Sequence, residues 1–384
     1  MNVKLKNEKI MTLRSLYFSA LCSMVVGVGF TACSEEDTPP IEPPTNTLSN
    51  VAYILHEGNM GDNNASLACL DLSDYTYQGN WYLAQNGEKL GDLAYDMKSY
   101  DGSLYIVVGG SKYIVKLDKE GRKSYQFTSE QGEPRSMVIA DGKIYVTSYS
   151  GLVHCLDAAS LTYEQSVQVA EKGVRLEGIA ERDGKLYVAV AYKVIPATEP
   201  GAWDTYVYQK EVVVVDANTM VKDTVLTVGS NPSVMTVLGS DVYLYSIGDY
   251  YMEGAIIQRI RTDYSVDTVA VANKMAVVGD KLFLVNAEVT YDPETWAATT
   301  TNTFMTYEPA TETLGGSFLG EGAPAELASA TIYLLSGDPV TGEIYVGTTD
   351  YVNTGTIYRF SADGQYIGQF DSEGLNPSKM VFFE

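Results

Sequence analysis

The chain has 384 residues, of which 49 are Asp or Glu and 26 are Lys or Arg, so its formal net charge at pH 7 is −23. A field of this sign repels phosphate backbones and excludes nucleic acid as an electrostatic partner. No polybasic patch is available for an anionic bilayer, so any link to a membrane must be a lipid.

The first 32 residues are typical of a bacterial lipoprotein signal peptide. Arg14 precedes an apolar stretch from Leu16 to Phe30 that is short for a membrane span, and Ala32 stands directly before Cys33. We expect Cys33 to carry the lipid and to become the first mature residue. An ordinary signal with a chance cysteine is the alternative.

Residues 33–49 are expected to form an acidic, proline-rich tether. The run Ser34-Glu-Glu-Asp37 follows the cysteine and resembles the surface-export signal of lipoproteins in Bacteroidota-type outer membranes. It would otherwise serve as a solvated spacer. The prolines between Thr38 and Thr45 favour a stiff, extended backbone. We therefore predict a lipoprotein of the outer membrane, exposed at the cell surface.

A short turn-and-strand phrase recurs six times along the rest of the chain. Each copy is a tight turn followed by an alternating apolar strand, which is a hairpin signal. The aromatic positions 105, 145, 187, 243, 283 and 345 are separated by 40, 42, 56, 40 and 62 residues, and a base period of about 40 is what a four-stranded propeller blade needs. The six copies are Asp101-Gly-Ser-Leu-Tyr105, Asp141-Gly-Lys-Ile-Tyr145, Asp183-Gly-Lys-Leu-Tyr187, Ser240-Asp-Val-Tyr-Leu244, Gly279-Asp-Lys-Leu-Phe283 and Thr341-Gly-Glu-Ile-Tyr345.

A seventh blade is predicted from the two ends of this region. The chain ends in a single strand after Asn376, while 51–55, 66–71 and 75–80 supply three strands that lack an innermost partner. Joining them closes the ring and removes exposed sheet edges. We predict an all-β fold over residues 50–384, a seven-bladed β-propeller with four-stranded antiparallel blades. Cys69 and Cys155 fall in blades that are not neighbours, so we expect two buried free thiols.

The loop after the first strand carries a family resemblance. An apolar strand is followed by Glu57-Gly-Asn59, a polar loop and Ala65-Ser-Leu67. Lys89-Leu-Gly-Asp92 with Met97 downstream, the Asp-Gly-x-Leu-Tyr turns and Gly355-Thr-Ile-Tyr-Arg-Phe-Ser361 add to the pattern. Over roughly residues 50–384 the chain resembles the YncE-like, seven-bladed surface lipoproteins of Bacteroidota. The resemblance implies capture of cobalamin or another corrinoid and its delivery to an outer-membrane TonB-dependent transporter, by a protein that is otherwise a monomer.

Candidate ligand contacts lie on the loops that join the second and third strands of a blade, or one blade to the next. Aromatic rings there offer contact area at low entropic cost, and a corrinoid's amides would suit Tyr, Trp, Asn and Arg. Contact with a protein partner and local loop packing are the alternatives for these residues. The candidates are His56, Asn59, Arg135, Tyr149, Arg175, Tyr192, Trp203, Tyr206, Tyr250, Tyr251, Tyr291, Trp296, Asp350 and Tyr351.

Neither catalysis nor a metal cofactor is expected. The chain has two histidines, of which His154 lies in the middle of a strand, and no His/Cys/Asp cluster has metal-ligand spacing. Asp92, Asp96, Asp249 and Asp350 could converge on a channel and hold calcium, but such residues are more often turn formers. A glycan-binding or protein-interaction propeller, and a propeller hydrolase or lyase, remain the alternative functions.

Overall fold

The computed structural model describes residues 50–199 and 201–383. The predicted signal peptide, the predicted lipidation site Cys33 and the predicted tether lie outside these residues. In the described part, no helix is long and apolar enough to cross a membrane.

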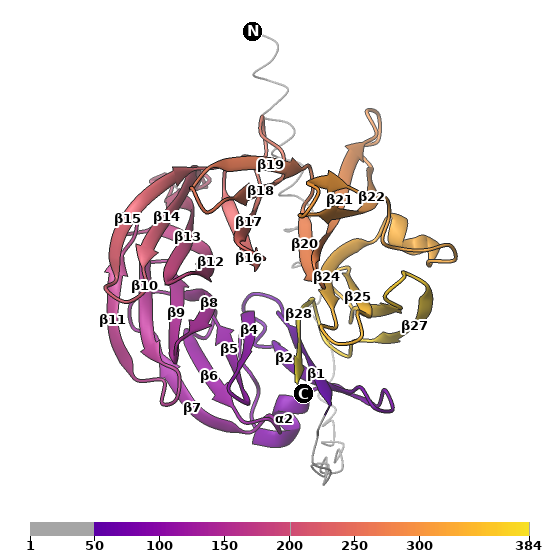
Figure 1. Cartoon of the computed structure of the whole chain (residues 1–384), viewed down its shortest axis with the longest axis horizontal. Coiled ribbons are helices and arrows are strands. Elements are labelled where there is room, and N and C mark those ends of the chain that lie inside the picture. The colour runs from indigo at the N-terminus through magenta and orange to yellow at the C-terminus, as the bar shows by residue number, and fades with distance from the viewer. Residues whose placement is uncertain (1–49, 200, 384) are drawn as a thin grey trace, which may run out of the picture. The chain divides into compact units, whose positions relative to one another are not determined.

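Residues 50–383 form seven four-stranded antiparallel sheets arranged in a ring, as predicted (Figure 1). The first three blades consist of β4–β7 (Ala94–Tyr100, Ser103–Val108, Tyr113–Leu117, Lys123–Thr128), β8–β11 (Pro134–Ala140, Lys143–Ser148, Leu152–Asp157, Tyr163–Gln168) and β12–β15 (Val174–Arg182, Lys185–Ile195, Thr205–Asp216, Val221–Thr227). Blades 4 to 6 consist of β16–β19 (Pro232–Leu238, Asp241–Ser246, Ile256–Ile260, Val266–Ala270), β20–β23 (Lys274–Val278, Lys281–Tyr291, Ala298–Glu308, Thr313–Leu314) and β24–β27 (Thr331–Gly337, Ile344–Thr349, Thr356–Phe360, Tyr366–Asp371).

The seventh blade joins the two ends of the propeller. Its order is β28 (Pro377–Phe383), β1 (Val51–His56), β2 (Ser66–Asp71) and β3 (Tyr77–Gln78). Val51 lies opposite Phe383, and Ile54 lies opposite Met380. This confirms the predicted closure. The third N-terminal strand is shorter than expected, because the chain turns at Asn80 into the short helix α2 (Trp81–Asn86), whose first two residues are buried.

The recurring phrase makes the turn that was expected of it. Asp101 and Gly102 have φ values of 47° and 66°, and Asp141 and Gly142 have values of 48° and 74°. Positive φ at both central residues defines the two-residue hairpin turn. The aromatic residue that follows is buried and links neighbouring blades, since the hydroxyl of Tyr105 donates to the carbonyl of Ala158, 2.7 Å away in the next blade.

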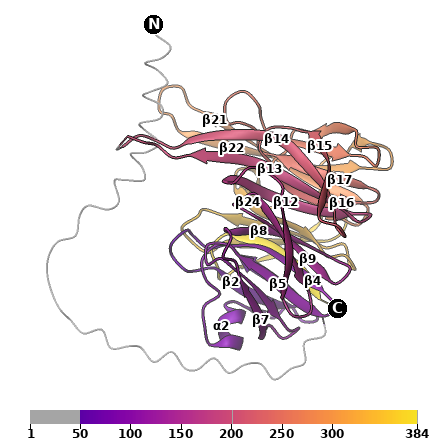
Figure 2. The same ribbon diagram turned by 90° about the vertical axis from the view of Figure 1, so that its left-hand side faces the viewer.

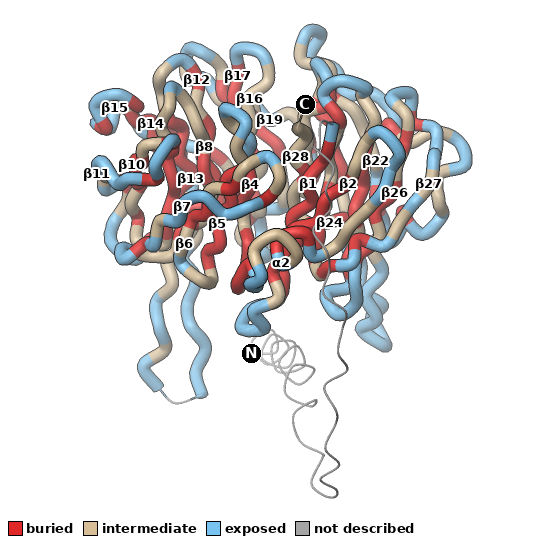
Figure 3. Tube along the Cα trace, turned by 90° about the horizontal axis from the view of Figure 1, so that it is seen from below, coloured by how far each residue is buried: buried red, intermediate tan, exposed pale blue. Residues whose placement is uncertain are grey.

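The core fills the spaces between adjacent sheets. In Figure 3 the buried residues follow the strands, and the exposed ones follow the turns and two protruding hairpins. Cys69 and Cys155 are buried and free, as predicted. The long gap in blade 5 has two sources, the extended β21–β22 hairpin and a connection from Gly315 to Ala330 that contains the 3₁₀ helix η1 (Ala325–Ala328).

Candidate functional site

One end of the ring carries the connections between blades and the turns between second and third strands, and we call it the loop face. Two hairpins, β13–β14 and β21–β22, extend from it well beyond the other strands (Figure 2). The candidate ligand residues were predicted on this face.

The innermost strands place side chains at the loop face by means of backbone bulges near their starts. The pairing register shifts between Ala94 and Asp96, between Pro134 and Met137, and between Ile332 and Leu334. A bulge leaves its extra residue unpaired and re-aims that side chain. The residues released in this way include Tyr95, Arg135 and Tyr333.

Arg135 and Arg175 alternate with tyrosines across blades 1 to 3, and we call this row the Arg–Tyr ladder. The guanidinium carbon of Arg135 lies 3.8 Å from the ring centroid of Tyr95 and 5.9 Å from that of Tyr149. The guanidinium carbon of Arg175 lies 4.5 Å from the centroid of Tyr149 and 5.4 Å from that of Tyr192. Distances below about 6 Å give favourable cation–π attraction. Each guanidinium thus lies between two rings.

Glu177 fixes the middle of the ladder. Nε of Arg135 donates to Oε2 of Glu177 at 2.6 Å, and the hydroxyl of Tyr149 donates to Oε1 at 2.8 Å. Nη1 of Arg175 donates to the hydroxyl of Tyr192 at 3.3 Å. The charge of Glu177 raises the pKa of Arg135 despite burial, and burial followed by the same charge raises the pKa of Tyr149. Both side chains therefore keep their protons at any physiological pH.

The ladder continues as a row of aromatic rings onto the β13–β14 hairpin. Ring centroids are 5.7 Å apart between Tyr192 and Tyr206, 6.5 Å between Tyr206 and Tyr208, and 5.7 Å between Tyr208 and Tyr250. Tyr206 and Tyr250 are exposed. The structure thus assembles six predicted residues into one continuous surface: Arg135, Tyr149, Arg175, Tyr192, Tyr206 and Tyr250.

Asn59 and Tyr351 form a second group around Tyr333. The rings of Tyr333 and Tyr351 meet edge to face at 5.9 Å, and the hydroxyl of Tyr333 donates to Oε2 of Glu57 at 2.6 Å. The side-chain amide of Asn59 donates to the carbonyl of Tyr351 at 3.1 Å. The charge of Glu57 also contributes to raising the pKa of Arg135, so the carboxylate lies near the ladder.

The central channel contains two lysines. A cavity of about 160 Å³ is lined by residues of β20, β24 and β28, including Lys274, Tyr333 and Lys379. Nζ of Lys274 donates to the carbonyl of Tyr333 at 3.2 Å. Burial, and then repulsion from Lys379, lower the pKa of Lys274 to about 8. Nζ of Lys379 lies 3.9 Å from the buried carboxylate of Asp96.

The hairpin tips carry the remaining aromatic candidates. Trp203 is 71% exposed, and Tyr251, Tyr291 and Trp296 are also exposed. Trp296 occupies the turn of the β21–β22 hairpin with φ of 60°. The aromatic row ends near two of them, since Tyr250 directly precedes Tyr251 and Tyr206 lies three residues after Trp203.

His56 is not placed as the prediction requires, whereas Asp350 is exposed in a turn of the loop face. His56 is 0% exposed, its Nδ1 lies 3.0 Å from the hydroxyl of Ser66, and Gly374 packs on its ring. The expectation that it faces a loop is therefore corrected, because β1 is buried through its last residue. The carboxylate of Asp350 accepts the amides of Val352 and Asn353 and acts as a turn former.

A calcium site does not form from the four aspartates. The carboxylate of Asp249 accepts hydrogen bonds from the backbone amides of residues 251–253, and that of Asp92 accepts one from the amide of Gly61. The carboxylate of Asp96 accepts hydrogen bonds from the hydroxyl of Ser136 and the amide of Met137. Among the described residues, no group of three or more His, Cys, Asp or Glu side chains could hold a metal ion.

Sequence reasoning missed several residues of the site, namely Tyr95, Glu177, Tyr208, Tyr333, Glu57, Lys274 and Lys379. One signal was available for two of them, Tyr95 and Tyr333, and they share it with the predicted Arg135. Tyr95 follows Ala94 and Tyr333 follows Ile332, as Arg135 follows Pro134, each directly after a buried residue at the start of an innermost strand. Glu57 stands within the Glu-Gly-Asn element that carried the family resemblance.

No protein-family model and no curated protein sequence matches the chain. Among solved structures, a protein from Lactobacillus plantarum is 13% identical over 88% of this chain and 100% of its own, with a TM-score of 0.56. The computationally designed protein Ika8 is 8% identical (88% and 92% covered, TM-score 0.51). Hydrazine synthase of Kuenenia stuttgartiensis is 13% identical (68% and 74% covered, TM-score 0.51). At such identities the likeness concerns the fold alone, and the chain is a seven-bladed β-propeller.

Proposed function

We propose that the propeller captures a bulky, amphipathic small molecule on its loop face, with the Arg–Tyr ladder as the docking surface. The observation that carries the proposal is the alternation of two guanidinium groups with three tyrosine rings along one continuous row. Rings offer apolar area with a hydroxyl at the edge, and guanidinium groups donate several hydrogen bonds. The row is held rigid by Glu177, so little order is lost on binding.

The ligand that we propose, on the family resemblance, is cobalamin or a related corrinoid. Its ring carries amide groups whose oxygens accept hydrogen bonds from Arg135, Arg175 and the tyrosine hydroxyls. In this proposal the lipid on Cys33 anchors the protein at the outer-membrane surface, and a TonB-dependent transporter receives the ligand. The role is binding rather than catalysis.

Calorimetry with cyanocobalamin and the purified protein tests the proposal. We expect heat of binding and a shift of the visible bands, with Arg175→Met weakening the affinity at least about tenfold, since a cation–π pair and its hydrogen bonds are worth about 1.4 kcal/mol or more. Arg122→Met, at an exposed turn of blade 1, is the matched control and should bind like the wild type. Absence of heat and of a band shift would reject the corrinoid, and normal binding by Arg175→Met would reject the ladder.

A protein-docking role is the second candidate, because apolar side chains stand exposed at the loop-face tips. Trp203, Tyr251 and Met252 all have more than two thirds of their surface exposed. In a pulldown from outer membranes, the wild type should retain a TonB-dependent transporter, and Trp203→Ser with Met252→Ser should release it. Val340→Ser, at an exposed apolar residue of the β24–β25 turn on the opposite face of the ring, is the control.

A further inference from the structure

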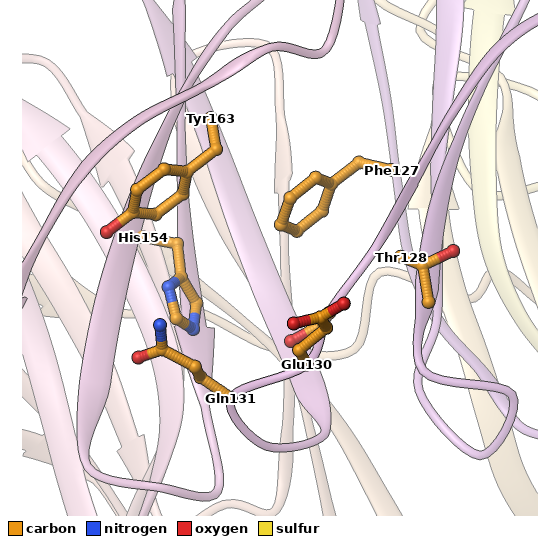
Figure 4. Close-up of a pocket in the computed structure, with 7 residues that line it drawn as sticks. Phe127, Thr128, Glu130, Gln131, His154 and Tyr163 are labelled. Atoms are coloured by element: carbon orange, nitrogen blue, oxygen red, sulfur yellow. The ribbon is translucent and has the colours of Figure 1, made fainter.

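Two cavities of the propeller differ in their chemistry. The larger, of about 280 Å³, lies between blades 1 and 2 and is lined by Phe127, His154 and Tyr163, with Glu130 as its one charged side chain (Figure 4). The smaller is the channel cavity of about 160 Å³, which lies among β16, β20, β24 and β28 on the inner rim of the ring. Two lysines and no acidic residue line it, and we call it the lysine cavity.

Cations outnumber carboxylates around the lysine cavity. Nζ of Lys379 and Nζ of Lys98 each lie 3.9 Å from the same carboxylate oxygen of Asp96, so two cations share one counter-charge. Arg135 is a further cation near Lys379, and its own ion pair with Glu177 balances it. The carboxylate of Asp96 therefore has no capacity left for a third lysine.

Lys274 is that third lysine. It donates one hydrogen bond, to the carbonyl of Tyr333, and forms no ion pair within residues 50–199 and 201–383. The carboxylate of Glu57 attracts Lys274 from beyond ion-pair distance and accepts the hydroxyl of Tyr333. Burial, and then repulsion from Lys379, lower the pKa of Lys274 to about 8, so at pH 7 the cavity confines two ammonium groups that repel each other.

The lining also has donors that no protein group uses. Lys274 has two N–H groups left, and Lys379 donates no hydrogen bond to any residue that the structure describes. The same holds for the hydroxyls of Tyr245 and Ser336, which line the cavity from β17 and β24. All four side chains are half-buried and keep accessible surface. They come from four successive blades, so the donors surround the cavity instead of sharing one wall.

Charge, donors and volume together select a small oxyanion. A cation would be repelled, and a neutral solute would leave the two ammonium groups without a counter-charge. Ammonium and hydroxyl groups donate to oxygen, and bonds between charged partners are the strongest. A carboxylate offers two oxygens in one plane, whereas phosphate offers four at the corners of a tetrahedron. A volume of about 160 Å³ is below that of ordinary ligand pockets, which begin near about 300 Å³, so a free ion fits and a nucleotide does not.

We propose that the lysine cavity binds one small tetrahedral oxyanion, such as inorganic phosphate, through Lys274, Lys379 and the hydroxyls of Tyr245 and Ser336. The anion supplies the counter-charge that Asp96 alone does not give to three lysines. The net charge of −23 repels anions at long range, so recognition depends on these direct contacts, and we expect an affinity of millimolar order. The site does not depend on the function proposed for the ladder.

Spectra of lysine labelled with ¹³C at Cε test the site directly, with Lys274→Met and Lys379→Met assigning the two signals. Sodium phosphate is titrated at pH 7 and constant ionic strength, with sodium chloride as the replaced salt. We expect saturable shifts of Lys274 and Lys379 and none of the exposed Lys172. Sulfate should act like phosphate, and acetate should bind at least about tenfold more weakly, because it has fewer acceptor oxygens. No saturable shift with phosphate or sulfate, or equal affinity for acetate, would overturn the proposal.

Variants separate the site from general effects of salt. Phosphate strengthens the folding of most proteins because it is excluded from their surface, so the urea midpoint is compared in phosphate and chloride. The wild type and the control Lys172→Met should gain more in phosphate than Lys274→Met, which lacks the site. Ser336→Ala keeps every charge and should weaken phosphate binding severalfold, and Arg175→Met, in the ladder, should leave it intact. An equal gain by Lys274→Met would refute the site.

Discussion

Arg135 donates from Nε to Oε2 of Glu177 over 2.6 Å, and this ion pair joins the innermost strands of blades 2 and 3 at the mouth of the channel. Glu177 is buried and Arg135 is about three-quarters covered. Removing one member of such a pair leaves the other charge buried without a counter-charge. The pair therefore shapes the loop face and contributes to the stability of the propeller.

Glu177→Gln should lower the free energy of unfolding by about 2–4 kcal/mol, because it leaves Arg135 partly buried without a counter-charge. Urea denaturation measures the change. The double variant Glu177→Gln/Arg135→Met should cost less than the sum of the single variants, which is the coupling expected of a direct pair. A loss below about 0.5 kcal/mol would mean that the pair behaves like an exposed one.

His56 should make the propeller sensitive to mild acid. Burial lowers its pKa from 6.5 to about 4, so between these pH values the unfolded chain binds a proton that the folded chain does not. The free energy of unfolding should decrease as the pH is lowered from 6.5 to 4, by up to about 1.4 kcal/mol per pH unit. Denaturation at pH 6.5 and 4.5 should show a larger loss for the wild type than for His56→Gln, and equal losses would contradict the assignment.

Lys274→Met should stabilise the protein at pH 7. The pKa of Lys274 is about 8 in the fold and 10.5 ordinarily, so the folded state carries the cost of a confined charge below pH 8. We expect a gain of roughly 1–2 kcal/mol. Between pH 8 and 10.5 the unfolded chain holds the extra proton, so wild-type stability should rise with pH and approach that of the variant. A difference that stays constant from pH 7 to pH 10 would exclude this titration.

Gly178 lies where two innermost strands meet, and its replacement should be costly. A Cβ atom at this position would lie 2.1 Å from the carbonyl oxygen of Ser233, a backbone atom that cannot swing away. Gly178→Ala should destabilise the propeller by about 2 kcal/mol or more through this clash. Gly368→Ala in β27, where nothing lies within 4 Å, is the matched control and should change the midpoint little.

The blades could be predicted because their turns need particular residues. Asp-Gly pairs accept positive φ, and the tyrosine three positions after the glycine fills the space between sheets. The same residues therefore recur wherever the same geometry recurs. The joined blade followed from leftover strands at both ends. The short helix α2 was missed because Trp81 and Tyr82 are as compatible with a strand as with a buried helical turn.

The site was predictable only in part. Aromatic and arginine residues at blade junctions pointed to Arg135, Tyr149, Arg175 and Tyr192 correctly as neighbours of the loop face. Bulges are not visible in an alternating pattern, so Glu177 has the appearance of an ordinary strand residue. Tyr95 and Tyr333 are marked only by their place after a buried residue near the start of an innermost strand. His56 failed for a related reason, since the point at which a strand leaves the core depends on packing by Gly374, far along the chain.

The pairing of Val51 with Phe383 also sets how the propeller responds to mechanical load. These residues lie at the same end of the β1–β28 strand pair, so a force that pulls them apart breaks the hydrogen bonds between the strands one after another. A force applied along the strands would have to break them together. Single-molecule pulling between residues 51 and 383 should therefore open the ring at low force, with β28 leaving first.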